Sequence, residues 1–502
     1  MSTSIKALGQ DEQPSVSHKE VLEYDEDSKQ DQSSALEGSA EPAHIEWTEE
    51  ESRRVRFKMD ICILPLLCFL MICSVGIKSN IGNANTAGMS ADLGLTNDQY
   101  TMLLTAFYIV YACSQWEILM LRFVQPRIWL FFVCMAWGLA SAMQGVTTNF
   151  GGMITCRVLI AFFEAGGVPA ISLYFSMLYP KEEYGLRWCI FQACAALSNA
   201  FAGALAYGIV QIKSSIPAWK LLFIIEAMPT FICGALILFF LPSGPGKCRF
   251  LNERENAVAY ARVFQGKPGE QEKGLNLKRM SRGLIRPWTW LIAIIHFCGS
   301  TAFNSISVFL TAILRDMGFT SIKAQGMSAP PYIVAYIVAV AIAFLSDRKK
   351  TRGIFVAIFG LLGGAGYIIV AYAPSMPARY FGVFMVAVGV YTGQPMMYAW
   401  CANNAHSPSE RGASLVLFSV TGQLGSILGS NIYPKHSAPR YYLGNTVCAG
   451  ALFMSCVLST IGTIVLRRRN RLKAIADAQR TPEELLTMRA DPDNRANYVY
   501  TI

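Results

Sequence analysis

Residues 59–78 of the sequence read MDICILPLLCFLMICSVGIK, and no charged residue lies between Asp60 and Lys78. An apolar block of about twenty residues is long enough to cross the hydrocarbon core of a bilayer as a helix. A helix also satisfies every backbone polar group within its own segment, which a lipid environment requires. The block therefore predicts a membrane-spanning helix. Because some fifty polar residues precede it, we expect a retained anchor rather than a cleaved signal.

Eleven further blocks of this kind follow, so the predicted fold class is an all-α polytopic membrane protein with twelve transmembrane helices. The composition agrees, because 53% of the 502 residues are apolar and only 15% are charged. The predicted spans cover residues 59–78, 99–120, 128–146, 153–178, 188–211, 220–241, 288–312, 325–346, 354–373, 380–402, 412–432 and 443–466.

The spans divide the chain into five parts. The acidic, Ser-rich residues 1–50 predict a disordered cytoplasmic tail. Residues 51–241 and 287–466 each predict a six-helix bundle, and residues 467–502 form a cytoplasmic C-terminal tail. Residues 242–286 are a polar cytoplasmic linker with a short helical segment from Glu253 to Phe264. Two such bundles suggest a parallel repeat with a solute site near the bilayer midplane between them.

Basic residues indicate how the chain is oriented in the membrane. With a cytoplasmic N-terminus, 28 Lys and Arg flank the spans on the inner side and about 8 on the outer side. The positive-inside rule then places both termini in the cytosol, where basic clusters meet anionic membrane lipid. The formal net charge of +9 needs no nucleic-acid partner. A basic tail that binds RNA is the alternative.

No signature of catalysis is present. The sequence has no GxxxxGK[ST] loop to power an ATP-driven pump, no HExxH motif and no nucleophile triad, so we expect no enzyme. Most of the fourteen cysteines fall inside apolar blocks without CxxC or His/Cys ligand spacing, which predicts no metal site, no cofactor and no disulfide framework. Any transport must therefore use a gradient or be passive.

Several short segments carry a family resemblance. They are Ser79-Asn80-Ile81-Gly82-Asn83-Ala84, Phe163-Glu164-Ala165-Gly166, Trp219-Lys220-Leu221-Leu222-Phe223-Ile224-Ile225-Glu226, Leu241-Pro242, Trp400-Cys401-Ala402-Asn403-Asn404 and Ala438-Pro439-Arg440-Tyr441. Together they resemble the fungal allantoate permease family of anion:cation symporters within the major facilitator superfamily, over about residues 55–475.

The resemblance implies the major facilitator fold, built as two six-helix bundles, and proton-coupled import of a carboxylate-bearing nutrient or vitamin. Expected partners are a small organic solute, protons and membrane lipid. We expect a chain that acts as a monomer in a fungal plasma membrane. The resemblance also implies a gate between helices 8 and 9, matched here by Asp347, Arg348 and Arg352. An ordinary positive-inside loop is the alternative for these three residues.

Two positions depart from the family pattern. The family's Asp-Arg pair at the end of helix 1 is Ile77-Lys78 here, and its Phe-Glu-Val-Pro pattern in helix 2 is replaced by a segment that includes Ser114, with Glu117 three residues later. These departures keep a second hypothesis open, export of a small fungal metabolite. A third is a membrane receptor that transports nothing.

Charged residues inside spans are expensive unless they face a partner or a wetted cavity. Arg157 and Glu164 are seven residues apart, which places them on one helix face about 10 Å apart along the axis. We expect Glu164 to carry protons and Arg157 to supply positive field, with a structural pair as the alternative. Glu226 is a further coupling candidate, or a partner of Lys220.

Polar residues at helical spacing mark candidate substrate contacts. Lys78, with Asn80 behind it, is predicted at the outer end of helix 1, where it either attracts a carboxylate or reaches to the membrane interface. His296 either titrates near neutral pH or is a neutral, hydrogen-bonded histidine. Polar residues that recur on one face of a span predict either a central cavity or hydrogen bonds between helices. The remaining candidates are Gln192, Asn199, His296, Asn304, Gln394, Tyr398 and Gln423.

Overall fold

The computed structural model describes residues 45–264, 277–405, 408–434, 437–481 and 500–501. Met1–Trp47 separate from the rest as a unit of their own, so the predicted 1–50 tail lies almost wholly outside the described residues. From Thr48 on, the described residues form helices and no strand. The helices are α2 (Glu49–Thr86), α3 (Met89–Asp92), α4 (Asn97–Cys113), the 3₁₀ helix η1 (Gln115–Arg122), α5 (Pro126–Gln144), α6 (Phe150–Ala165), α7 (Val168–Leu178), α8 (Lys181–Val210), α9 (Ala218–Phe240), α10 (Glu253–Phe264), α11 (Leu277–Ile285), α12 (Pro287–Asp316), α13 (Ser321–Lys349), α14 (Gly353–Tyr372), α15 (Met376–Asn403), α16 (Pro408–Asn431) and α17 (Tyr442–Ala478).

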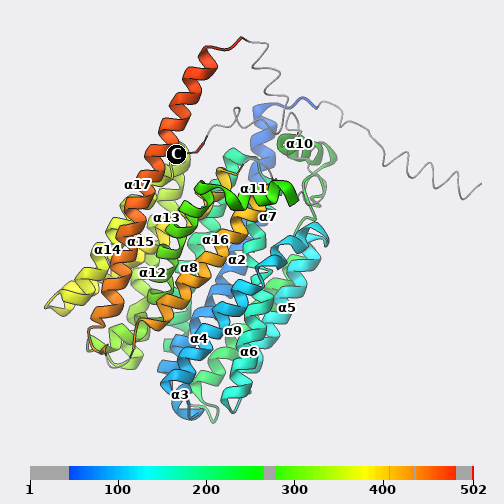
Figure 1. The fold of residues 1–502 in the computed structure, drawn as a ribbon. Coiled ribbons are helices and arrows are strands. Elements are labelled where there is room, and N and C mark those ends of the chain that lie inside the picture. The colour runs from blue at the N-terminus through cyan, green and yellow to red at the C-terminus, as the bar shows by residue number, and fades with distance from the viewer. Residues whose placement is uncertain (1–44, 265–276, 406–407, 435–436, 482–499, 502) are drawn as a thin grey trace, which may run out of the picture. The chain divides into compact units, whose positions relative to one another are not determined.

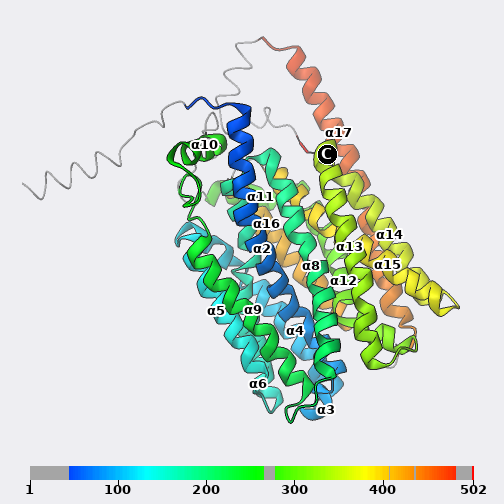
Figure 2. The same ribbon diagram turned by 180° about the vertical axis from the view of Figure 1, so that it is seen from behind.

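Each predicted span coincides with a helix or with a broken pair of helices (Figures 1 and 2). Among the described residues, ten helical spans are long and apolar enough to cross a bilayer, and the bent pair α4–η1 is an eleventh. α15 is the twelfth by length, because its 28 residues at a rise of 1.5 Å reach about 42 Å. Buried polar residues such as Thr392 and Gln394 lower the hydropathy of α15.

The structure corrects two predicted boundaries. α2 does not end at residue 78 but continues to Thr86, so the segment from Ser79 to Ala84 lies inside the helix. The second span is not one straight helix, because α4 ends at Cys113 and η1 follows at an angle of 44°.

The fourth predicted span is interrupted. α6 ends at Ala165 and α7 begins at Val168, with two glycines between them. A Cβ atom on Gly166 would lie 2.3 Å from Glu117 Oε2, and one on Gly167 would lie 2.5 Å from the Trp137 ring. The glycines therefore let η1 and α5 pack directly against the interrupted span.

The same pattern of helix pairing occurs twice along the chain. In the first half α2 packs on α8 and α9, α5 on α6 and α9, and α4 on α6. In the second half α12 packs on α16 and α17, α14 on α15 and α17, and α13 on α15. These pairings relate α2, α4, α5, α6–α7, α8 and α9 in order to the six helices from α12 to α17. The chain therefore folds as two six-helix bundles built on one plan.

An ion pair repeats in the same two bundles. Arg56 in the first turns of α2 bonds Glu183 near the start of α8 at 3.2 Å. Arg286, just before α12, bonds Glu410 near the start of α16 at 3.1 Å. Because the partners occupy equivalent places, each bundle fastens its first helix to its fifth at the same end.

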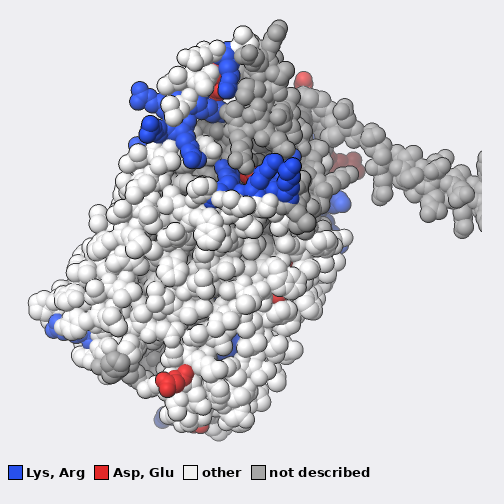
Figure 3. All heavy atoms as spheres, in the orientation of Figure 1, with Lys and Arg blue, Asp and Glu red and all other residues white. Residues whose placement is uncertain are grey.

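Helix α10 is fastened to the first bundle at that end, which we call the linker end because it carries α10 and α11 (Figure 1). Arg262 of α10 donates to Glu183 at 2.6 Å, and Lys58 of α2 donates to both oxygens of Glu255 at 2.7 and 2.9 Å. Lys and Arg side chains gather near α11 and the last turns of α17, while the face of the bundles seen in Figure 3 is almost free of charge. An apolar flank with charge at its end suits a membrane protein.

Acid is expected to loosen α10. The Lys58 ammonium holds the pKa of Glu255 below its ordinary value. The ion pair is therefore fully present above the ordinary carboxylate pKa of roughly 4.3 and is lost as the pH falls through the lowered pKa of the folded state. Hydrogen exchange of residues 253–264, corrected for its intrinsic pH dependence, should accelerate below that pH. At pH 7 Glu255→Gln should reproduce the acceleration and Glu253→Gln, at an exposed position, should not. Equal exchange in all three proteins would contradict the role given to this pair.

Candidate functional site

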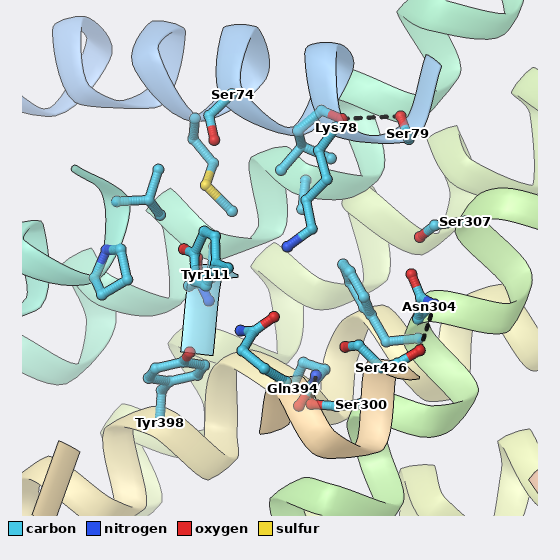
Figure 4. A pocket seen from close by; sticks show the side chains of 18 of the residues that line it. Ser74, Lys78, Ser79, Tyr111, Ser300, Asn304, Ser307, Gln394, Tyr398 and Ser426 are labelled. Carbon is cyan, nitrogen blue, oxygen red and sulfur yellow. Dashed lines mark hydrogen bonds between the residues drawn. The ribbon is translucent and has the colours of Figure 1, made fainter. Parts of the chain in front are cut away.

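A cavity of about 110 Å³ lies between the two bundles. Residues of α2, α4, α6, α7 and α8 line it from the first bundle, and residues of α12, α15 and α16 line it from the second. Figure 4 shows side chains from both bundles pointing into the same space. The cavity therefore lies where the parallel repeat places a solute site.

Lys78 and Glu164 are the charged residues in the lining of this cavity. Glu164 Oε1 accepts a hydrogen bond from Ser74 Oγ at 2.6 Å, while Oε2 has no hydrogen-bond partner among the described residues. Lys78 Nζ lies 5.1 Å from the ring centroid of Tyr108 and 4.7 Å from that of Tyr111. No carboxylate of the described chain lies within ion-pair distance of it. Figure 4 shows Lys78 reaching from α2 into the cavity.

This position corrects the prediction that Lys78 lies at the outer end of its helix, and of the two alternatives it favours the one in which the lysine attracts a carboxylate. Since α2 continues for two more turns, the lysine lies inside the span and its ammonium group faces the cavity. A half-buried cation that lies over aromatic rings inside a span is a ready partner for an anion.

Arg157 is 1% exposed and does not line the cavity. Its guanidinium carbon lies 5.0 Å from the centroid of Phe107, and Lys78 Nζ lies 5.3 Å from the same centroid. Its Nε and Nη1 atoms have no hydrogen-bond partner among the described residues. Arg157 and Glu164 form no ion pair in this part of the chain, so the predicted shared face does not produce a bonded pair. Arg157 instead adds positive charge behind the aromatic wall of the site.

Asn80 and Glu226 lie away from the cavity. Asn80 is fully buried, and its Oδ1 accepts a hydrogen bond from Asn83 Nδ2 at 3.1 Å. Both carboxylate oxygens of Glu226 in α9 are buried without a hydrogen-bond partner among the described residues. Lys220 lies over the Trp219 ring and forms no ion pair with Glu226. The pairing considered for Glu226 and Lys220 is therefore not formed.

Glu117 does not restore the missing helix 2 carboxylate to the cavity. It is 2% exposed in η1 and lies against Gly166, at the break between α6 and α7. Trp129 Nε1 donates to the Gly166 carbonyl at 2.7 Å in the same place.

The second bundle supplies a neutral polar wall. His296 Nδ1 lies 3.1 Å from Gln394 Oε1, and the imidazole ring stacks on Phe418 with a centroid distance of 3.7 Å. Gln394 Nε2 donates to Ser300 Oγ at 3.2 Å, and Asn304 Nδ2 donates to the Ser426 carbonyl at 2.8 Å. Oxygen and amide groups of this kind can orient a small organic solute.

Most of the other predicted contacts are also brought together here. Gln192, Tyr398 and Gln423 line the cavity. The side-chain oxygens of Gln192 and Gln423 have no hydrogen-bond partner among the described residues. Asn199 does not line the cavity, but its amide donates to the hydroxyl of the lining residue Tyr391 at 2.7 Å.

A second, larger cavity of about 760 Å³ lies at the end of the bundles opposite the linker end. Its lining includes Gly82, Asn85 and Thr86 from the last turns of α2. We call this second cavity the vestibule. Two contacts between the bundles lie between the vestibule and the central cavity. Tyr108 donates a hydrogen bond to Asn304 across the bundles, and a Cβ atom on Gly82 would lie 2.6 Å from the Val308 carbonyl. α2 and α12 therefore touch through backbone at this point.

At the linker end Arg352 contacts both bundles. It is 3% exposed, and its Nη2 lies 3.1 Å from Asp347 Oδ1. The guanidinium also crosses to the first bundle, where a Cβ atom on Gly185 would lie 1.9 Å from Nη2 and Cys189 Sγ is 3.7 Å from Nη1. Arg348 is exposed and takes no part. We call Asp347, Arg352 and the facing α8 residues Gly185 and Cys189 the linker-end gate.

Arg352→Gln should open this gate and expose Cys189. A charge-assisted hydrogen bond is worth about 1.5–3 kcal/mol, so alkylation of Cys189 by N-ethylmaleimide should rise roughly tenfold or more. Peptide-resolved mass spectrometry measures the rate. Arg348→Gln is the control, and the buried Cys134 reports global unfolding. An unchanged rate at Cys189 in Arg352→Gln would remove Arg352 from the gate.

Sequence reasoning missed several cavity residues. Ser74 gives no signal on its own, because a hydroxyl in a span bonds its own helix in most cases. Tyr108, Tyr111 and Tyr391 could have been found as aromatic residues with a polar end inside apolar blocks. Trp188 lies at the start of a predicted span, where an interfacial tryptophan is expected.

The comparisons with known proteins agree with this architecture. Residues 67–430 match the Major Facilitator Superfamily. The chain is 30% identical over 466 residues to the uncharacterized transporter C1002.16c of Schizosaccharomyces pombe, covering 92% of this chain and 93% of that one. It is 33% identical over 457 residues to the MFS-type transporter cnsO of Penicillium expansum, covering 86% and 88%.

Solved structures share the fold at low sequence identity. The proton:xylose symporter XylE superposes with a TM-score of 0.63 at 12% identity, covering 81% of this chain and 94% of that chain. The human organic anion transporter MFSD10 gives a TM-score of 0.56 at 14% identity, covering 82% and 100%. Given two repeated six-helix bundles, a charged cavity between them and matches over most of its length, this chain is a membrane transporter of the Major Facilitator Superfamily.

Proposed function

We propose that the protein is a secondary-active carrier that imports a small carboxylate-bearing solute together with protons, in the manner of the allantoate permease family. The observation that carries the proposal is the charge balance of the central site. Lys78 and Glu164 both line the cavity, and Arg157 lies behind the ring that Lys78 also contacts. When Glu164 is ionised the three groups sum to +1, and when it is protonated they sum to +2.

The charge of these three residues couples the binding of a proton to the binding of an anion. Protonation of Glu164 removes the negative charge that would repel a carboxylate and leaves Lys78 without a counter-charge. The anion therefore binds the protonated site more tightly, and by reciprocity the proton binds more tightly when the anion is present. A carrier that changes its facing only when both are bound would move them together.

We place the linker end in the cytosol of a fungal cell and the vestibule outside the plasma membrane. The support is the basic linker end together with the fungal relatives named above. In this orientation the vestibule collects solute from the medium, and the linker-end gate is the exit to the cytosol.

Export of a small metabolite is the second candidate. It is favoured by Ile77 and Ser114, which stand where the resembled family has charged or acidic patterns, and by the position of Glu117 outside the cavity.

Uptake by proteoliposomes separates these functions. Purified protein is tested against a panel of labelled small carboxylates, with the outside more acidic than the inside. Proton-coupled import predicts accumulation that a protonophore abolishes. Accumulation only when the gradient is reversed supports export, and saturable binding without flux supports a receptor. Either of the last two results would overturn the proposed direction or the proposed activity.

A further inference from the structure

The end of the chain returns to the linker end of the second bundle. Tyr500 and Thr501 lie against α15 and α17, and we call these two residues the C-terminal strap. Thr501 N donates to Asn404 Oδ1 at 2.9 Å, and Asn404 Nδ2 donates to the Thr501 carbonyl at 3.0 Å. Trp400 Nε1 donates to the same carbonyl at 3.0 Å. Three hydrogen bonds therefore bind Thr501, and all of them involve its backbone.

The neighbouring residue is held in the same way from the other side. Tyr500 N donates to Asn470 Oδ1 at 3.0 Å, and Asn470 Nδ2 donates to the Tyr500 carbonyl at 2.8 Å. In an extended chain the backbone groups of successive residues point to opposite sides. Asn404 at the end of α15 and Asn470 in α17 thus bind the backbone of two successive residues, as neighbouring strands do in peptide recognition by strand addition.

The side chains that bind Thr501 are buried and packed inside the second bundle. Trp400 is fully buried and Asn404 is 1% exposed, so both donors would lose a partner inside the protein if the strap left. The Trp400 ring packs edge to face on Trp288 with a centroid distance of 4.9 Å. A Cβ atom on Gly353 would lie 2.6 Å from the same ring, and Gly353 directly follows the gate residue Arg352.

We propose that this surface is a docking site for the chain's own C-terminal residues, which it recognises through their backbone, and that docking fastens α15 to α17 beside the linker-end gate. Strap release removes the partners of Trp400 Nε1 and Asn404 Oδ1 and loosens the contact between Trp400 and Gly353. The inference does not depend on the solute or on proton coupling.

Backbone recognition gives a matched pair of variants at one position. Thr501→Pro removes the N–H group that Asn404 accepts, while Thr501→Ala keeps it. In the full-length protein, alkylation of Cys189 by N-ethylmaleimide, followed by peptide-resolved mass spectrometry, should be about tenfold faster in Thr501→Pro than in the wild type, since each 1.4 kcal/mol of docking is tenfold in population. Thr501→Ala should resemble the wild type. Asn404→Ala should resemble Thr501→Pro, and Asn97→Ala, an exposed asparagine at the opposite end, should not.

A second measurement tests the same site without changing the strap-binding surface. A variant that ends at residue 499 is mixed with a fluorescent peptide of the sequence Ala-Asn-Tyr-Val-Tyr-Thr-Ile, which corresponds to residues 496–502. The peptide should bind and should slow N-ethylmaleimide alkylation of Cys189, and the same peptide with proline in place of threonine should do neither. Equal alkylation of Cys189 in Thr501→Pro and Thr501→Ala, or equal binding of the two peptides, would overturn the proposal.

Discussion

Glu164→Gln is expected to abolish gradient-driven accumulation of the solute while leaving exchange of solute across the membrane measurable. Glutamine keeps the size of the side chain and retains an oxygen to accept the Ser74 hydrogen bond, which is 2.6 Å long in the wild type. It cannot bind and release a proton, so the site stays in the state without negative charge. The anion still binds, but no proton gradient is drawn on to concentrate it.

The measurement is uptake of a labelled carboxylate by proteoliposomes, with accumulation and counterflow followed separately. Glu226→Gln is the matched control, because that carboxylate lies outside the cavity. The variant should accumulate solute like the wild type. Undiminished accumulation by Glu164→Gln would exclude Glu164 as the proton carrier.

Lys78→Gln is expected to raise the dissociation constant for carboxylates roughly 10- to 100-fold. The estimate follows from about 1.5–3 kcal/mol for a hydrogen bond to a charged group. The loss should be specific to anions, because a neutral solute of the same shape gains little from the ammonium group. Equilibrium binding to purified protein measures both affinities.

Lys213→Gln is the control for this change, since Lys213 is exposed and does not line the cavity. An unaltered affinity for carboxylates in Lys78→Gln would show that the lysine is not an anion contact.

Apolar blocks were enough to predict where each spanning helix lies, and the pattern of the linker predicted the short helix from Glu253 to Phe264. Hydropathy failed where polar residues face protein instead of water. Ser79, Asn80 and Asn83 are all buried inside α2, so a polar run that reads as the end of a span is its continuation. Hydropathy reports how polar a residue is and says nothing of whether it faces solvent or a neighbouring helix.

The candidate site was predictable as a set of residues but not as a set of contacts. Spacing and residue type singled out Glu164, His296, Asn304 and Gln394, and these four residues line the cavity. Spacing could not show that Arg157 turns to the Phe107 ring instead of to Glu164, because that choice depends on which helix packs beside α6. The C-terminal strap could not be predicted either, since backbone recognition leaves no pattern in the side chains that are recognised.

The claim that a proton and an anion bind the central site together is tested most directly by the affinity of one carboxylate measured against pH. The probe is the carboxylate with the largest gradient-driven uptake in the vesicle screen. Since the anion favours protonated Glu164, its dissociation constant in wild-type protein should rise with pH, approaching tenfold per pH unit, and should be flat in Glu164→Gln. The same pH dependence in both proteins would contradict the account.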